Sequence, residues 1–204
     1  MEGPLTPRRT QVERSETTRA ALMAAARRLF TEKGYAATGR EEIAAAAGVT
    51  RGALYHHFAS KEALFRAVVE ELEEEMTTQV ATVAMRGAPD AAAELRLGCL
   101  AFLDACLDPS VRRIVLLEAP AVLGWEQWRA IDERYGLALL THGVQAVMDA
   151  GLVEPGPTSP LAHMLLGALN EAALLVATAD KPKAARAEVG RTVEQVLERL
   201  LTPA

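Results

Sequence analysis

The side chains best suited to recognise another molecule lie in residues 50–57, TRGALYHH. Arg51 carries a guanidinium, Gly52 leaves the backbone uncovered, and Tyr55 and His56 offer aromatic hydrogen-bonding groups. A guanidinium can bind the edge of guanine through two hydrogen bonds, which contributes ~1–3 kcal/mol of discrimination between bases. Glycine allows the backbone to approach a ligand closely. The chemistry of Arg51 is therefore compatible with contact to the edge of a base.

Two short helices are predicted to position these side chains. Thr38 can cap the first helix while Glu41 reaches back to it in a capping box, and Ile43 and Ala47 place apolar groups on one face. Gly48 is expected to end this helix, because glycine accepts a positive φ.

The second helix is predicted over residues 51–58. Thr50 is its N-cap, and Val49 with Leu54 forms a hydrophobic staple that sets the angle at which the helix departs. Leu54 and Phe58 face inward, so the polar and aromatic side chains point outward. Two helices held at a fixed angle by a short turn form a helix-turn-helix, whose second helix enters the major groove of DNA.

A third helix is predicted from Ser60, with Lys61 at its N-terminus beside the expected DNA surface. Caps of this kind are also typical of an ordinary helical hairpin. The whole string, however, resembles the TetR family of bacterial transcriptional regulators over roughly residues 14–72. Within it, AGVTRGALYHHF followed by SK and LF is similar to the multidrug-efflux-repressor branch of that family.

The resemblance implies a role for each matching position. Residues that touch phosphate or support the recognition helix in the family match Thr38, Thr50, Tyr55, His57 and Lys61. Residues that can read base edges match Arg51, Gly52, Ala53 and His56. His57 lies near the inward face, so a packed histidine is the alternative to a phosphate contact. His56 departs from the aromatic residue that the family often has there, and the base preference therefore does not carry over.

The distribution of charge supports a DNA-binding segment independently. The whole chain has a net charge of −5, yet residues 8–66 hold eleven Lys or Arg against six Asp or Glu. Residues 67–204 hold eleven against twenty. Because DNA repels an acidic surface, this segregation is expected to present a basic N-terminal face to the duplex.

The composition predicts an all-α fold. Half of the 204 residues are hydrophobic but only 4% are aromatic, and apolar residues recur at helical spacing throughout. We predict a flexible arm over residues 1–13, a helix-turn-helix domain over residues 14–59, and a helical effector-binding and dimerisation domain over residues 60–204. In the arm, Arg8 and Arg9 could reach the minor groove, although a disordered tail is the simpler interpretation. The N-terminus lacks the apolar core of a signal peptide, which predicts a cytoplasmic protein.

Seven long or medium helices are expected outside the two short ones. They are predicted over residues 16–33, 60–85, 89–107, 109–117, 125–150, 160–179 and 182–201. Residues 161–179 approach the length of a membrane span, but His163, Asn170 and Glu171 make a helix buried between protein surfaces the better interpretation. No membrane association is predicted.

The resemblance also implies a mechanism. In TetR-like proteins the last two long helices form a four-helix bundle with those of a second subunit, so a homodimer and an inverted-repeat operator in double-stranded DNA are expected. Two recognition helices about 34–36 Å apart would read successive major grooves. A ligand that changes the spread of the connector helices would then lower DNA affinity, and the apo dimer would repress.

The remaining helices are expected to enclose an effector pocket. Candidate lining residues are polar, aromatic or sulfur-containing groups on otherwise apolar helices: Phe102, Cys106, Glu118, Trp125, Trp128, Tyr135, His142 and Asn170. Each could equally be a packing residue, and Asn170 could serve the dimer interface. Together they predict a small, elongated, mainly apolar effector with one or two polar groups.

Other chemistry has little support in the sequence. Cys99 and Cys106 are predicted to be core thiols, because they are too far apart on one helix for a disulfide; pairing between molecules or one reactive thiol is the alternative. No metal site or cofactor is predicted. An enzyme is a remote alternative, since only Glu118 and His142 offer an acid and a base and no catalytic motif accompanies them. An activator, or a regulator controlled by a protein partner, remains open.

Overall fold

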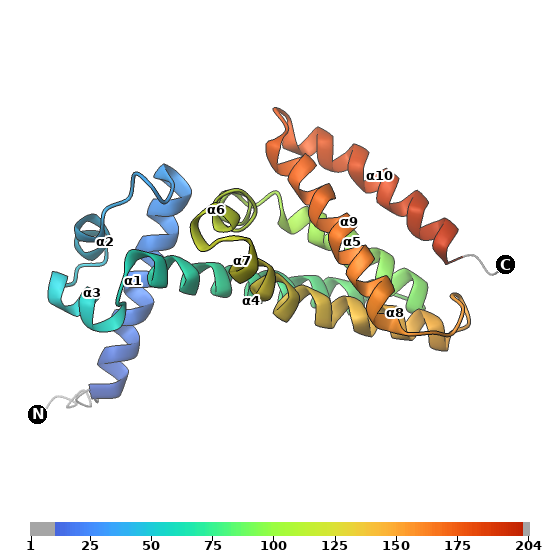
Figure 1. Ribbon diagram of the computed structural model, residues 1–204, viewed down its shortest axis with the longest axis horizontal. Helices are drawn as coiled ribbons and strands as arrows, with labels where there is room; N and C mark the ends of the chain where they lie inside the picture. Colours follow the sequence, from blue (N-terminus) through green and yellow to red (C-terminus); the bar gives the residue numbers. More distant parts are fainter. Residues whose placement is uncertain (1–10, 202–204) are drawn as a thin grey trace, which may run out of the picture. The chain divides into compact units, whose positions relative to one another are not determined.

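The computed structural model of the chain describes residues 11–201, which contain helices and no strand (Figure 1). The predicted all-α fold is confirmed. Arg8 and Arg9 lie outside the described residues. The chain divides into two compact units, Met1–Val68 and Val69–Ala204, which are described separately below.

The N-terminal unit consists of α1 (Gln11–Lys33), α2 (Arg40–Ala46), α3 (Arg51–His57) and the first turns of α4 (Lys61–Gly87). Because α1 begins at Gln11, residues 11–13 are helical and do not belong to an arm as the sequence analysis expected. Gly34, with φ +84°, follows the last residue of α1 and turns the chain toward α2.

Aromatic rings fill the core of the N-terminal unit. Phe30 of α1 and Phe65 of α4 are completely buried, and their ring centroids lie 5.2 Å apart. The ring of Tyr35 packs against both, at 5.8 Å and 5.0 Å. Ile43 and Leu54 bring α2 and α3 onto the same core. Burial of these large side chains, each of which contributes about 1.5–3 kcal/mol, fixes the two short helices in place.

The C-terminal unit contains the rest of α4 and eight further segments. They are α5 (Ala91–Ala105), the π-helical η1 (Val111–Glu118), α6 (Ala119–Leu123), α7 (Trp125–Asp132), the π-helical η2 (Glu133–Leu137), α8 (Ala138–Asp149), α9 (Thr158–Thr178) and α10 (Pro182–Leu200). The core joins α5, α8, α9 and α10 through the buried side chains Leu95, Cys99, Val144, Val147, Ala162, Leu165, Leu169 and Leu197.

The structure corrects the sequence-based helices in the middle of the chain. The helix predicted over residues 125–150 is α7, η2 and α8 in succession, with a widened π-helical turn between two α-helices. The helix predicted over residues 109–117 is the π-helical η1, and the short α6 follows it unpredicted. Apolar periodicity does not register such widening, because an added residue shifts the pattern without breaking it.

Helix α9 has one buried and one exposed face. Its inner face buries Leu165, Leu169 and Ala173, whereas Met164 is 72% exposed and Leu175 is 55% exposed. The helix is long and apolar enough to cross a membrane by length and composition, and 44% of its most apolar window is buried within the protein. The expectation of burial on nearly all sides is therefore wrong for a single chain.

Candidate nucleic-acid interface and ligand cavity

A tight turn between α2 and α3 sets the angle of the helix-turn-helix. Gly48 has φ +66°, and its N–H donates to Ala45 O at 3.1 Å, while Val49 N–H donates to Ala44 O at 3.0 Å. Thr50 then caps α3, since its Oγ1 accepts the N–H of Ala53 at 3.2 Å. The predicted turn and cap are therefore confirmed.

Thr38 does not cap α2 as the capping-box prediction required. The cap position is held by Gly39, which makes no side-chain cap bond. Thr38 is 1% exposed, and its hydroxyl donates to Gly34 O at 2.7 Å. The Thr38 hydroxyl therefore bonds to the carbonyl of Gly34, just after α1, and not to a backbone N–H of α2. From this buried position, Thr38 holds the loop before α2 in place.

The outward face of α3 carries the residues expected to read DNA. Arg51, Gly52, Tyr55 and His56 are exposed, whereas Ala53 and His57 are half-buried. Leu54 and Phe58, which were predicted to face inward, are 1% and 5% exposed.

A cluster of charged and aromatic groups covers this face. The Arg51 guanidinium donates to Tyr55 Oη at 3.2 Å and lies 3.3 Å from a Glu41 carboxylate oxygen. Two guanidinium groups also lie over the Tyr55 ring. The distance from the guanidinium carbon to the ring centroid is 4.5 Å for Arg40 and 5.4 Å for Arg51. Arg40 was missed by the sequence analysis. Its place as the first residue of α2 was obscured by the misplaced cap at Thr38.

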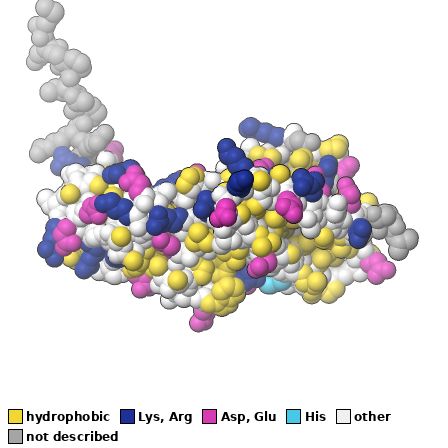
Figure 2. Space-filling model, turned by 90° about the horizontal axis from the view of Figure 1, so that it is seen from above, with side chains coloured by type: hydrophobic (Ala, Val, Ile, Leu, Met, Phe, Trp, Pro, Cys, Tyr) yellow, Lys and Arg dark blue, Asp and Glu magenta, His cyan; other side chains and the backbone are white. Residues whose placement is uncertain are grey.

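Lys61 acts on the protein's own backbone. Its ammonium donates to Tyr35 O at 2.8 Å and to Thr38 O at 3.0 Å, and it lies 4.1 Å from the centroid of the Tyr35 ring. Ser60 caps α4 as predicted, accepting the N–H of Ala63 at 2.9 Å. Of the two roles that the resemblance allowed for Lys61, this geometry matches support of the motif. Basic side chains are spread widely over the surface of the N-terminal unit (Figure 2).

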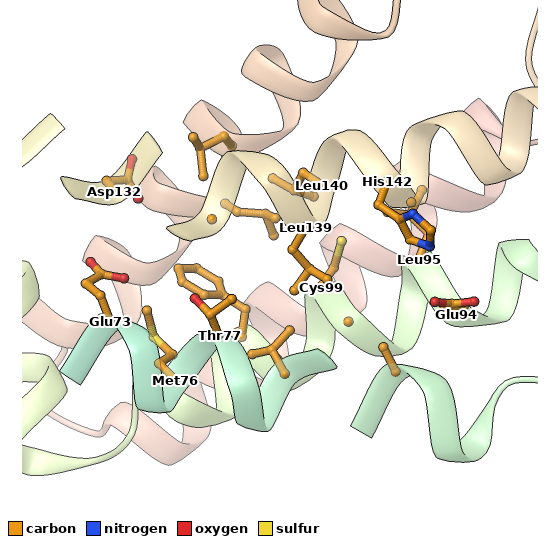
Figure 3. A pocket seen from close by; sticks show the side chains of 18 residues that line it. Glu73, Met76, Thr77, Glu94, Leu95, Cys99, Asp132, Leu139, Leu140 and His142 are labelled. Atoms are coloured by element: carbon orange, nitrogen blue, oxygen red, sulfur yellow. The ribbon is translucent and has the colours of Figure 1, made fainter. Parts of the chain in front are cut away.

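The C-terminal unit contains a mostly apolar cavity, part of which is open to solvent (Figure 3). Its walls come from α4, α5, α7, η2, α8 and α9. Apolar side chains of the wall include Met76, Val80, Leu95, Phe102, Leu140 and Leu166. A concave, mostly apolar site with a few polar groups is the kind that binds small organic ligands.

Two of the eight candidate effector residues line this cavity, Phe102 and His142. Asn170 does not line the cavity itself, but its Nδ2 donates to Oδ2 of the lining residue Asp132 at 2.8 Å. The residues outside the wall are Cys106, Glu118, Trp125, Trp128 and Tyr135. Trp128 is a packing residue whose indole N–H donates to Val115 O at 3.1 Å, and Trp125 is 67% exposed beside it.

The cavity also has an acidic end that the sequence analysis missed. Glu73 and Asp132 line it and are 3% and 6% exposed. Burial, together with the neighbouring charge of Asp132, raises the pKa of Glu73 to about 8. Glu73 belongs to the acidic run EELEEE, which reads as a solvated stretch. It lies, however, four residues after Val69 and three before Met76, both inward-facing, and that spacing was the available signal.

Both cysteines are buried core residues. Burial raises the pKa of the Cys99 thiol to about 12 and raises that of Cys106 as well. Cys99 lines the cavity. Because the thiolate is the reactive form, both sites disfavour oxidation, and the redox alternative gains no support.

Comparisons with known proteins agree with this arrangement. A profile of the bacterial regulatory proteins of the tetR family matches residues 22–68, and one of the tetracyclin repressor-like C-terminal domain matches residues 92–200. The Transposon Tn10 TetC protein of Escherichia coli is 30% identical over 68% of this chain and 67% of its own length. The HTH-type transcriptional regulator CymR of Pseudomonas putida is 47% identical, and the match spans 34% of each chain.

A solved structure resembles nearly the whole chain. It is a TetR-family transcriptional regulator from Pectobacterium atrosepticum, 35% identical, with a TM-score of 0.82 over 96% of this chain and 100% of the other. Fold and interface together define a helix-turn-helix DNA-binding transcriptional regulator. The chain belongs to the TetR family, and family membership indicates a non-enzymatic transcription factor.

Proposed function

We propose that this protein is a repressor that binds an inverted-repeat operator as a homodimer and releases it when a small, mainly apolar effector enters the cavity. One observation carries the proposal. A single chain combines an outward-facing recognition helix, α3, with a separate unit that holds a mostly apolar cavity. The proposed domains are residues 14–59 for DNA binding and residues 60–204 for effector binding and dimerisation.

Base reading is assigned to the exposed face of α3. Arg51 has the guanidinium for guanine, Gly52 allows close approach, and His56 projects from the same surface. Tyr55 and His57 are assigned to phosphate contact or to support of the helix. Arg40 joins this group, because its guanidinium lies against the Tyr55 ring.

Dimerisation is assigned to α9 and α10. Their outer surface contains the exposed apolar side chains Met164, Leu175 and Val196, and a groove between the two helices is lined mainly by apolar residues. At the outer face of α9, a Cβ added to Gly167 would meet nothing within 4 Å, so another helix could approach closely. Burial of this face against a second copy would also account for the length and apolarity of α9. The family consists of soluble cytoplasmic regulators, and the same location is proposed here.

Control by the effector is assigned to α4. This helix begins in the DNA-binding unit at Lys61 and contributes Glu73, Met76 and Val80 to the wall of the cavity. A ligand that favours one position of α4 would change operator affinity. Linkage requires DNA to weaken the ligand by the same factor.

Selection of bound duplexes from a random pool tests the DNA-binding part of the proposal. The full-length protein should enrich an inverted repeat whose half-sites are about one helical turn apart or a multiple of it. Binding at several salt concentrations separates sequence recognition from phosphate attraction, which alone gives a steep salt dependence. Enrichment of a single half-site would contradict the dimer, and salt-sensitive binding without any enriched sequence would contradict operator recognition.

A further inference from the structure

A buried carboxyl group without a partner lies at one end of the cavity. Glu73 is 3% exposed and lines the cavity, and the described part of the chain supplies it with neither a hydrogen bond nor an ion pair. Figure 3 shows Glu73 and Asp132 at the same end, with Glu94 and His142 at the other. Buried carboxylates are normally paired or hydrogen-bonded, because the unpaired ion loses its hydration without compensation.

The neighbouring acid already has polar partners of its own. Asp132 accepts hydrogen bonds from Arg129 and from Asn170, both at 2.8 Å. The same Arg129 also bonds to Glu133 at 3.0 Å, so this guanidinium is shared between two carboxylates. It makes no ion pair with Glu73.

Other titratable groups near Glu73 offer no positive charge. The Cys106 thiol is buried, and the charge of Glu73 contributes to raising its pKa. Glu70 lies one turn before Glu73 on α4, and its carboxylate is 4.0 Å from the guanidinium of Arg134. Arg134 is therefore paired with Glu70 and not with Glu73. The acidic end therefore has a deficit of one positive charge whenever Glu73 is ionised.

The remaining wall limits what could supply that charge. Apolar side chains such as Met76, Val80 and Leu166 line the rest of the cavity, and Phe102 adds an aromatic ring. A hydrated metal ion would find few ligands among these side chains, whereas an apolar body would bury its surface against them. The arrangement suits a molecule with one cationic group on a hydrophobic frame.

We propose that the cavity binds an amphipathic organic cation, with its ammonium or related group against Glu73 and Asp132 and its apolar body along the wall formed by α4, α5 and α8. The inference rests on the proposed function, because it names the chemical class of the effector. An uncharged ligand would not compensate the charge of Glu73 once this residue is ionised, and an anionic ligand would be repelled by the carboxylates of Asp132 and of ionised Glu73.

The ionisation of Glu73 gives the proposal a distinctive signature. In the empty cavity its pKa of about 8 keeps most of the carboxyl protonated at pH 7. A permanent cation favours the ionised form, so binding releases a proton below pH 8. Affinity should therefore rise up to about tenfold per pH unit as pH increases toward 8, and should level off above it.

Calorimetric titration of the full-length protein with decyltrimethylammonium tests this binding. The uncharged 1-decanol and the anionic decanoate are matched probes, and each is measured from pH 6 to pH 9 well below micelle formation. The cation should bind most tightly, with the pH dependence given above, whereas 1-decanol should bind with an affinity independent of pH. Equal binding of all three probes, tighter binding of decanoate, or no binding of the cation would overturn the proposal.

The variant Glu73→Gln keeps the shape and removes the charge. It should bind the cation at least tenfold more weakly, lose the pH dependence, and retain its affinity for 1-decanol, which also verifies that it folds. Glu74→Gln is the control, because Glu74 is an exposed neighbour on the same helix. An unchanged affinity of Glu73→Gln for the cation would contradict the proposal.

Operator binding separates this inference from the proposed function. A selected operator together with absent cation binding would reject the cation site and leave the DNA-binding regulator intact. Cation binding through Glu73 without any change in operator affinity would support the site and reject its role as the effector site.

Discussion

At the scale of single residues, Arg51 is already engaged before DNA binds. Its guanidinium donates to Tyr55 and lies beside Glu41, and all three side chains are at the surface. An exposed ion pair of this kind contributes only about 0–1 kcal/mol, so a base edge in the major groove can displace Glu41 readily. The contact with Tyr55 can persist in the complex.

Replacing Arg51 should therefore affect sequence discrimination more than stability. We expect Arg51→Ala to weaken binding to the selected operator by ~1–3 kcal/mol and to relax preference at one base pair of each half-site. Competition binding with operators substituted at each position measures both effects. Arg28→Ala is the control, because Arg28 is an exposed cation on α1 that pairs with Glu32. An unchanged base preference in Arg51→Ala would exclude Arg51 from base reading.

Lys61 is predicted to be a positioning residue. Its ammonium donates to two carbonyls of the loop before α2. Lys61→Met should therefore lower the free energy of unfolding by about 1–3 kcal/mol and reduce the affinity for all DNA sequences equally. Denaturant unfolding and binding to operator and random duplexes measure this. Lys33→Met removes an exposed ion pair with Glu42 and should change stability by under about 1 kcal/mol. Loss of DNA affinity without loss of stability in Lys61→Met would indicate a direct phosphate contact instead.

The buried carboxyl of Glu73 makes stability depend on pH. Its pKa is raised from the ordinary 4.5 to about 8, so the folded state binds more protons than the unfolded state between those values, and stability falls as pH rises through that window. Glu73→Gln should gain on the order of 4 kcal/mol relative to the wild type between pH 5 and pH 9, at about 1.4 kcal/mol per pH unit up to pH 8. Denaturant melts at both values measure this gain. If the stability difference between Glu73→Gln and the wild type were the same at pH 5 and at pH 9, Glu73 would be solvated.

At the scale of secondary-structure elements, the π-helical η2 shapes the cavity. It follows Asp132 directly and contains Gly136, both of which line the cavity. A Cβ at Gly136 would lie 3.2 Å from Leu166 Cδ1 and 3.9 Å from Asp132 Oδ1. Glycine thus leaves room beside the acidic end that any other residue would narrow.

Gly136→Ala should consequently bind ligands less well without losing its fold. The Leu166 methyl must move by a few tenths of an ångström, and we expect a several-fold loss of affinity for decyltrimethylammonium with little change in unfolding temperature. Calorimetry and thermal melting measure the two effects. Gly156→Ala, where a Cβ meets nothing within 4 Å, is the matched control. Full ligand affinity in Gly136→Ala would place the ligand away from this wall.

The success of sequence-based prediction differed between elements for physical reasons. The turn at Gly48 and the caps at Thr50 and Ser60 were predicted correctly, because they depend on residues close together in the chain. The capping role of Thr38 was wrong, since the competing acceptor, Gly34 O, is positioned only by the folded loop. The π-helical turns depend on packing that local periodicity does not report. The inward orientation of Glu73, in contrast, follows from its spacing to Val69 and Met76 and was missed because it lies in an acidic run.

At the scale of the whole molecule, the exposed apolar surface and the charge segregation both point to assembly. Leu175 and Val196 are 55% and 56% exposed, and they belong to the last two helices. The N-terminal segment is basic, whereas the remainder is acidic. A second copy would cover the apolar surface and bring two recognition helices to one operator.

Leu175→Asp should prevent that assembly. A buried unpaired charge at the interface is strongly unfavourable, so the variant is expected to be monomeric at micromolar concentration and to lose most of its operator affinity. Sedimentation velocity and operator binding measure both. Met85→Asp is the control, because Met85 is an exposed apolar residue of α4, outside the proposed interface. A dimeric Leu175→Asp variant would move the interface elsewhere.

The cluster around Tyr55 has a consequence for the entropy of binding. Arginine side chains normally lose considerable rotamer freedom when they are fixed against DNA. Here the Tyr55 ring, with Arg40 on it at 4.5 Å and Arg51 at 5.4 Å, already restricts both guanidinium groups in the free protein. In the proposed complex, part of the ordering cost would thus be met during folding, and the recognition surface would meet the duplex preorganised.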